Sequence, residues 1–475
     1  MNLLYFFRSQ IAIFTATVVI TLFYFPNVTG QESVKPFFDG AGDPASQETM
    51  SKAAANIEKY RKGDFNLMLV DSKGKPINAK VAIELTNHKF HFGTSMLGIS
   101  SGVNLTSELQ ELAKKAITDI FNTVHVCDYW HNYRPDTESY VYKNDRPEED
   151  LKFAAKHNLF PRYHAILYNY PRWIMGRGYT SEQCWQMIEG RIKYVADNYR
   201  DRITEFDVFN EHVSAFGWPD FKQFYDESPG FPQFRDPQEA KRVMNLTRKY
   251  LPDAKLVILE AQLPSVYNPK FMATVDCWRE MVKAGVDFDY VGHQAHFSSM
   301  GGDYRNGSKY YPNGGDTYTM AGIEKALDEL GSIGKPVIIT EFNGPTRAEI
   351  SEKENAAWTL SDEENAAWQI NFYRLVFSKP YIEQLTRWYL IDGFGGRRGI
   401  DAGVLYKNGE KHAVYDKLRD LIKKEWHTAI QQTPQNGRLA FRGFFGTYSV
   451  KVNGYKLAIV ILDKTGEAKI ILEKK

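Results

Sequence analysis

The 475-residue chain is poor in cysteine: Cys127, Cys184 and Cys277 are the only three, and none belongs to a CxxC pair. The odd count leaves at least one thiol unpaired, and we interpret all three as small buried hydrophobic residues. Charge of one sign is also lacking, because 59 basic residues face 58 acidic ones. Nothing therefore indicates a nucleic-acid or acidic-polymer partner. No metal-ligand set stands out, and we expect neither a metal nor a cofactor, and no obligate protein partner.

Long apolar runs are missing except near the start of the chain. Residues 11–25 are apolar apart from three threonines and follow a short segment with one positive charge, Arg8. A membrane-spanning helix needs about 20 apolar residues, which is more than this run supplies. We interpret residues 1–30 as a signal peptide cut before Gln31, with an uncleaved anchor as the alternative. The sequence thus predicts a secreted or periplasmic protein.

The rest of the chain divides by composition. Residues 31–55 are polar and rich in small residues, which indicates a linker. Residues 56–88 have the pattern of a β-hairpin extension, with two strand-like runs around a turn at residues 71–76. Residues 89–427 are expected to form the catalytic domain. Residues 435–475 carry short β-patterned runs and predict a small β appendage, against which the hairpin could pack.

Eight apolar, strand-like runs alternate with amphipathic stretches inside the catalytic region. Near-continuous apolar strands alternating with helices indicate a parallel sheet buried on both faces. Eight such units predict an α/β fold, a (β/α)₈ TIM barrel with small β elements flanking both ends. The rival is a doubly wound open sheet, but no Gly-rich phosphate loop follows the first strand. The expected strands are 90–96, 120–128, 160–168, 203–210, 255–260, 288–297, 336–342 and 385–391.

Two carboxylates close strands of this barrel. Asn210-Glu211 ends the fourth expected strand, and Thr340-Glu341 ends the seventh. Catalytic groups of TIM barrels sit at the carboxyl ends of the strands. A carboxylate at the end of an apolar strand is costly unless it has a partner or a task. Glycoside cleavage uses two carboxyl groups that flank one bond, and a retaining enzyme holds them about 5–5.5 Å apart.

Several motifs in order resemble glycoside hydrolase family 10, the endo-1,4-β-xylanase family, over residues 90–425. The segment 206–211 is similar to its W-D-V-x-N-E, and Thr340-Glu341 to its T-E-L-D. Residues 292–297 are similar to its G-x-Q-x-H. The segment 162–164 is similar to its R-G-H, and Trp388 stands where the family has W-G-x-x-D.

The resemblance implies a retaining double displacement on a xylan-type polysaccharide, with Glu211 as acid/base and Glu341 as nucleophile. It implies that Asn210 binds the sugar 2-hydroxyl and that His296 keeps Glu341 ionised. The remaining substrate-binding positions that it implies are His164, Gln294, Trp388 and Trp130.

This chain departs from the family on the glycone side. Where the family has E-N-x-M-K-W, residues 125–130 keep only Trp130, although Asp128 and Tyr129 could offer other hydrogen bonds. The acidic residue after the nucleophile is replaced by Asn343. A β-glucanase or another related β-glycanase is therefore an alternative to a xylanase, and a non-catalytic carbohydrate-binding barrel is a further one.

An aromatic-rich insertion lies between Ser214 and Asp236, directly after the acid/base. It predicts either a loop that stacks on substrate at the aglycone side or a surface loop that packs on itself.

Overall fold

A computed structural model describes residues 39–102, 104–130, 133–134, 139–140, 146–168, 172–213, 219–297, 317–345, 361–393 and 402–475. The segment expected to be a signal peptide lies outside the described residues. No helix among the residues described is long and apolar enough to cross a membrane.

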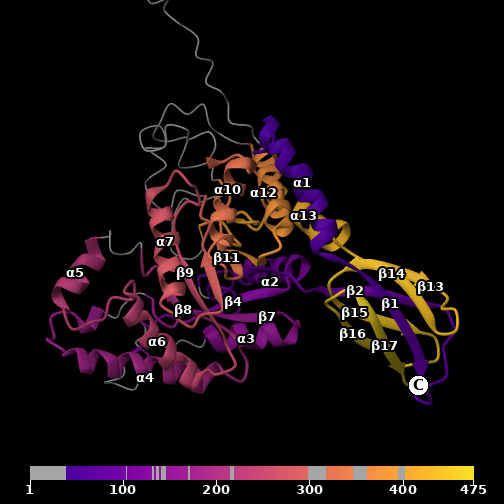
Figure 1. Ribbon diagram of the computed structural model, residues 1–475, viewed down its shortest axis with the longest axis horizontal. Coiled ribbons are helices and arrows are strands. Elements are labelled where there is room, and N and C mark those ends of the chain that lie inside the picture. Colours follow the sequence, from indigo (N-terminus) through magenta and orange to yellow (C-terminus); the bar gives the residue numbers. More distant parts are fainter. Residues whose placement is uncertain are drawn as a thin grey trace, which may run out of the picture. The chain divides into compact units, whose positions relative to one another are not determined.

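Eight parallel strands close into a barrel, as predicted (Figure 1). Their order around the barrel is β10-β11-β12-β3-β4-β7-β8-β9, so neighbours in sequence are neighbours in space except where β12 closes onto β3. Each expected run contains one strand or overlaps it, and the observed strands are mostly shorter. They are β3 (His91–Ser95), β4 (Thr123–Cys127), β7 (Phe160–His164), β8 (Glu205–Asn210), β9 (Lys255–Glu260), β10 (Tyr290–His293), β11 (Val337–Phe342) and β12 (Ile382–Arg387).

Helices follow the barrel strands, and side chains fix the start of most of them. Thr106, Thr180, Asp236, Asn268, Thr319 and Ser361 each accept a hydrogen bond from a backbone N–H of the first turn. Such a cap satisfies a donor that the helix itself leaves without a partner. The helices are α2 (Ser107–Ile120), α3 (Arg146–Lys156), α4 (Ser181–Tyr199), α5 (Pro219–Glu227), α6 (Pro237–Tyr250), α7 (Pro269–Lys283), α10 (Met320–Gly331), α12 (Asp362–Ser378) and α13 (Ala413–Asp420), with short turns at Arg172–Ile174 and Leu421–Glu425.

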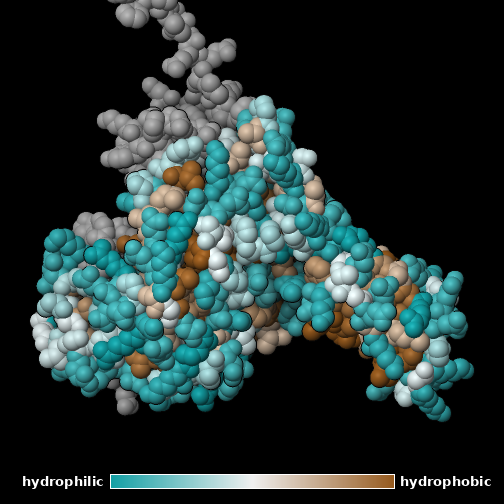
Figure 2. Space-filling view, viewed as in Figure 1, coloured by the Kyte–Doolittle hydropathy of each residue, from teal (hydrophilic) through white to brown (hydrophobic). Residues whose placement is uncertain are grey.

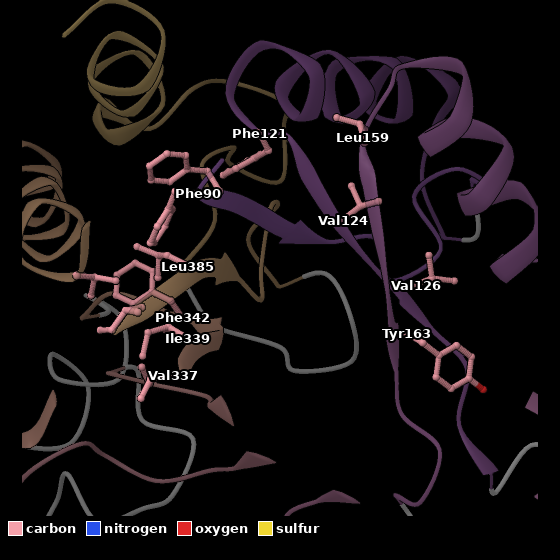
Figure 3. Packing of buried hydrophobic residues seen from close by; sticks show 14 of the residues in the cluster. Phe90, Phe121, Val124, Val126, Leu159, Tyr163, Val337, Ile339, Phe342 and Leu385 are labelled. Carbon is pink, nitrogen blue, oxygen red and sulfur yellow. The ribbon is translucent and has the colours of Figure 1, made fainter. Parts of the chain in front are cut away.

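The main core lies between the strands and the helices. Val124 and Val126 of β4 belong to it, and so do Val337 and Ile339 of β11; all four are completely buried (Figure 3). The alternate residues of β4, Thr123 and His125, belong to no apolar cluster. This alternation follows from the two-residue period of a strand.

The chain ends form a separate pair of sheets. One has the order β14-β1-β17 and the other β13-β2-β15-β16. The N-terminal strands do pack with the C-terminal ones, but the predicted hairpin is wrong, because β1 and β2 lie in different sheets and pair with distant partners. The strands are β1 (Lys62–Asp71), β2 (Val81–His88), β13 (Ala429–Gln432), β14 (Arg438–Phe444), β15 (Gly446–Val452), β16 (Ala458–Leu462) and β17 (Gly466–Leu472); a two-stranded ribbon joins β5 (Tyr133–Arg134) to β6 (Ser139–Tyr140).

The linker prediction for residues 31–55 is also wrong for its second half. Helix α1 (Pro44–Tyr60) begins there, with Asp43 as the N-cap and a proline in the first turn. Its narrow buried stripe is made of Ser46, Thr49, Ala53 and Ile57, and Thr49 donates a hydrogen bond to Glu324 of α10. Such small and polar residues bury little apolar surface, which is why the segment resembles a linker in sequence.

Candidate active site

Glu211 is positioned by the end of a wholly buried strand. Every residue of β8 is buried, and Glu211 follows its last residue, Asn210. Its φ is +57°, in the left-handed region that non-glycine residues rarely adopt, and its N–H donates to the carbonyl of Leu259 on β9 at 3.0 Å. The side chain is 4% exposed. A strained residue held by its neighbours is a frequent feature of functional sites.

Gln294 joins Glu211 to its neighbour. Its Nε2 donates to Oε1 of Glu211 at 2.8 Å and to Oδ1 of Asn210 at 3.0 Å. Gln294 follows β10, and its own N–H donates to the carbonyl of Glu260 at 2.9 Å. The carbonyl of Gln294 in turn accepts the N–H of Glu341 at 3.2 Å. The Glu211 carboxylate and the Glu341 backbone therefore contact one residue at the same mouth of the barrel.

Two histidines flank Glu341, which is 3% exposed on β11. Nε2 of His296 lies 3.3 Å from Oε2, and Nε2 of His164 lies 3.6 Å from Oε1. Nδ1 of His296 meets the side-chain amide of Asn343 at 2.8 Å. Each imidazole thus uses one nitrogen toward Glu341 and the other toward a fixed partner, an arrangement that sets ring orientation.

His164 belongs to a buried chain of charges inside the barrel. Its Nδ1 lies 2.7 Å from Oδ2 of Asp207, which also pairs with Arg162. The guanidinium of Arg162 also lies 2.8 Å from Glu205. Burial opposes a charge on His164, but the hydrogen bond to Asp207 and the charges of Glu341 and Asp207 outweigh it and raise its pKa.

Trp388 and Tyr129 lie around His164. The ring centroid of Trp388 is 5.3 Å from that of His164, edge to face, and the backbone N–H of Trp388 donates to the carbonyl of Phe342 at 3.1 Å. The Tyr129 ring is 5.7 Å from His164 and 5.6 Å from Tyr168. Burial, Cys127 and the charge of Glu341 raise the pKa of Tyr129 well above its usual range. Aromatic faces therefore line this side of the site.

Trp130 does not join this group. It is 1% exposed and packs against Phe231, with 6.0 Å between the ring centroids. A tryptophan held in that way contributes to the core. Asp128 also turns away from the mouth, because its carboxylate accepts from the hydroxyl of Tyr163 at 2.8 Å.

The aromatic insertion packs on itself where it is described. Phe224, Phe231 and Phe234 are at most 3% exposed and contact one another. Phe234 also stacks on Phe209 of β8, with 4.9 Å between ring centroids. These three residues belong to the core, whereas the side chains of residues 214–221 lie outside the described ones.

Sequence reasoning missed Asp207 and Arg162 as members of the site, whereas Tyr129 was named as a possible hydrogen-bonding residue. The signal for the first two was available, because Arg162 and Asp207 are charged residues within the expected barrel strands, and buried charges must be paired. Within the residues that the structure describes, no group of three or more His, Cys, Asp or Glu could hold a metal ion.

Comparisons with known proteins identify the fold and the family. Residues 84–421 match the model of glycosyl hydrolase family 10. Endo-1,4-beta-xylanase B of Thermotoga neapolitana is 22% identical over 307 residues, which are 62% of this chain and 78% of that protein. Crystalline xylanase 10B of Thermotoga petrophila, in complex with xylobiose, has a TM-score of 0.54 at 19% identity and covers 71% of this chain and 95% of that chain.

A third relative is not named as a xylanase. Anti-sigma-I factor RsgI6 of Acetivibrio thermocellus is 25% identical over 414 residues, which are 85% of this chain. The match covers 46% of that protein, so this chain spans about half its length.

Proposed function

Because this chain belongs to glycosyl hydrolase family 10, we propose that it cleaves β-1,4-linked xylan-type polysaccharide by a retaining mechanism. The observation that carries the proposal is the shared contact of Glu211 and Glu341 with Gln294 at one barrel mouth. Two carboxyl groups on either side of one glycosidic bond are what the double displacement requires. Their separation is expected near 5–5.5 Å, as in retaining enzymes.

Glu211 acts as the acid/base in this proposal. The Gln294 amide donates to one carboxyl oxygen of Glu211 and orients the group. As an acid it protonates the departing glycosidic oxygen, and as a base it then removes a proton from the attacking water. Gln294 also holds Oδ1 of Asn210, which directs the amide nitrogen of Asn210 to the sugar 2-hydroxyl.

Glu341 acts as the nucleophile and attacks the anomeric carbon to form a covalent glycosyl-enzyme. The imidazoles of His164 and His296 lie within 3.6 Å of its two oxygens and fix its position. Trp388 provides an aromatic surface beside His164 for a sugar ring. His125, Val126 and Tyr129 stand where the E-N-x-M-K-W motif of the family has Glu, Asn and Lys. The glycone side is therefore less charged than in the motif, which keeps β-glucan as an alternative substrate.

The substrate is tested with arabinoxylan, glucuronoxylan, cellulose, mixed-linkage glucan and mannan. Reducing-end release from the xylans, with a set of short products, supports an endo-xylanase. Release from a glucan alone overturns the choice of xylan and leaves the mechanism in place.

The roles are tested with Glu211→Ala and Glu341→Ala on a dinitrophenyl glycoside. This leaving group needs no proton, so Glu211→Ala should accumulate the glycosyl-enzyme, and azide should release it as the β-glycosyl azide. Glu341→Ala lacks the covalent step, so any azide product should be the α anomer. Exchanged stereochemistry between the two variants would show the roles reversed.

The second candidate is a carbohydrate-binding barrel without hydrolysis. The specific observation in its favour is the match, over 85% of this chain, to a protein named as an anti-sigma factor. Calorimetric titration with xylohexaose separates the two candidates: binding by the wild type with the ligand recovered intact after days supports the second one. Product formation that Glu341→Gln abolishes supports the first.

We also propose export to the periplasm or the exterior, with residues 1–30 removed. The supporting observation is the charged start followed by a short apolar run. N-terminal sequencing of exported protein should begin near Gln31, and material that still begins at Met1 overturns the cleavage.

A further inference from the structure

Asn343 stands behind the histidine that contacts Glu341. The side chains of Asn343 and His296 are at most 4% exposed. The amide of Asn343 lies 2.8 Å from Nδ1 of His296, and Nε2 of the same ring lies 3.3 Å from Oε2 of Glu341. The backbone holds the pair in register, because His296 and Asn343 form a parallel bridge and the carbonyl of Asn343 accepts the N–H of Phe297 at 2.9 Å.

The hydrogen-bonding capacities of these groups leave one consistent arrangement. An ionised carboxylate only accepts, so Nε2 of His296 must carry the proton that faces Glu341. In a neutral imidazole Nδ1 is then an acceptor and needs a donor. The side-chain nitrogen of Asn343 is placed to donate, and a carboxylate at this position could not.

We propose that Asn343 is a positioning residue that holds His296 as the neutral tautomer with its proton on Nε2. The proton on Nε2 of His296 then faces Oε2 of Glu341, 3.3 Å away, without bringing a positive charge to that side of the nucleophile. The inference rests on the proposed function for its catalytic meaning, since it assigns the protonation of a group that contacts the nucleophile.

An acidic residue in place of Asn343 would change the charge of the site. The family that this chain resembles has T-E-L-D here, with Asp two positions after the nucleophile. An ionised Asp accepts a hydrogen bond, so Nδ1 would have to carry a proton as well as Nε2, and His296 would become a cation beside Glu341. The amide therefore separates this chain from the motif in charge while it keeps the shape of the side chain.

Other ionisable groups near His296 do not replace this control. His293 on β10 accepts the Ala295 N–H through Nδ1, and burial followed by the proximity of His296 lowers its pKa to about 3, which keeps it neutral. On β12, Arg387 is engaged with Gln369 and the carbonyl of Ala402. Among the residues that the structure describes, His164 on β7, Cys127 at the end of β4 and Tyr129 after it interact with the charge of Glu341. Glu211 after β8 contacts Gln294, whose carbonyl accepts the N–H of Glu341.

The direct test is nitrogen NMR of the full chain labelled with ¹⁵N-histidine, with the His296 signals assigned by their loss in His296→Gln. In the wild type at neutral pH, Nε2 should be protonated and Nδ1 should be unprotonated. In Asn343→Asp both nitrogens should be protonated. Asn343→Ser retains a hydroxyl that can donate, so it should restore the wild-type pattern. A protonated Nδ1 in the wild type overturns the proposal.

The kinetic test is the pH profile of kcat/KM on the preferred glycan. A cation beside Glu341 should move the acid limb of Asn343→Asp to lower pH by about one unit or more, since an opposite charge within ~4–6 Å lowers a carboxyl pKa by ~1–3. The matched control is Asn365→Asp. Asn365 is a buried amide on α12 that donates to the carbonyl of Pro345, and its replacement should leave the acid limb of the pH profile in place.

The two measurements separate the possible failures. An unmoved acid limb in a folded Asn343→Asp variant overturns the proposal, as does an equal shift in Asn365→Asp. If the wild type cleaves no glycan, the proposed function fails, whereas the NMR pattern still decides the tautomer. If Asn343→Asp does not fold, the ¹⁵N spectra of Asn343→Ser and Asn343→Ala decide whether the proposal holds. In Asn343→Ser both His296 nitrogens should keep the wild-type protonation pattern. In Asn343→Ala, which has no donor for Nδ1, the protonation of Nδ1 should no longer be fixed.

Discussion

Asp207 is the residue whose removal the structure makes most informative. It is completely buried and serves two partners, with Oδ2 2.7 Å from Nδ1 of His164 and the other oxygen paired with Arg162. Asp207→Asn keeps the shape and removes the charge, which leaves Arg162 with only Glu205 and a neutral amide nearby. Breaking one partner of a buried pair costs about 3–5 kcal/mol. We expect a loss of that size in the free energy of unfolding at acidic pH.

The loss should depend on pH with a defined sign. The folded state raises the pKa of His164, so this residue contributes stability that is fully present below its unfolded pKa of about 6.5 and is lost as pH rises through the folded value. Asp207→Asn removes the hydrogen bond and charge that raise it. The difference in stability between wild type and variant should therefore be larger at pH 5.5 than at pH 9.

Urea denaturation at both pH values measures this difference. Glu205 is a competing source of pH dependence, because burial, and less so Asp207, raises its pKa to about 7 while Arg162 opposes the rise. Repeating the comparison in a Glu205→Gln background removes that contribution. An equal difference at pH 5.5 and pH 9 in this background would refute the assignment of the charge to His164.

Two further predictions concern aromatic and apolar surfaces. Trp130→Ala should cost about 3–5 kcal/mol of stability with KM little changed, because its indole packs on Phe231 in the core. Trp388→Ala should instead raise KM by about tenfold, equivalent to about 1.4 kcal/mol. Thermal melts and glycan kinetics on both variants measure these effects on stability and KM, and a raised KM in Trp130→Ala would contradict the prediction. The double change Ile459→Lys and Ile461→Lys targets β16, the edge strand of its sheet, where the two side chains are 59% and 69% exposed. Figure 2 shows apolar surface on the sheets at the chain ends. It should leave stability within about 0.5 kcal/mol and reduce light scattering on storage, and unchanged scattering would show that this surface does not associate.

The barrel could be predicted from sequence because its signal is local. Most residues of the strands are buried, and several strands contain a continuous apolar run, as Leu256 to Leu259 and Val337 to Ile339 do. The pairing of β1 and β2 could not be read in that way. Their partners lie more than 340 residues further along the chain, at 429–472. When two strands are close in sequence, the sequence pattern alone favours a hairpin between them.

The site was predictable to the extent that strand ends meet at one edge. Glu211 and Glu341 close strands of the same parallel barrel, so their ends had to share a mouth, and Gln294 contacts both. A motif match does not say which way a side chain points after the strand ends. Trp130 and Tyr129 are adjacent in sequence, yet one packs on Phe231 and the other lies beside His164.

The two histidines beside Glu341 are not equivalent, and their partners explain why. His164 is backed by the carboxylate of Asp207, which favours the protonated ring, and Asp207 is itself held by Arg162. His296 is backed by the amide of Asn343, which in the proposed arrangement favours the neutral ring. One oxygen of the nucleophile then faces an imidazole able to carry charge, and the other faces a neutral donor. A nucleophile between two cations would be held as a carboxylate to low pH but would attack more weakly, since each positive charge stabilises the anion that must be consumed in forming the glycosyl-enzyme. Placing a carboxylate behind one ring and an amide behind the other keeps Glu341 oriented on both sides while limiting that stabilisation to one.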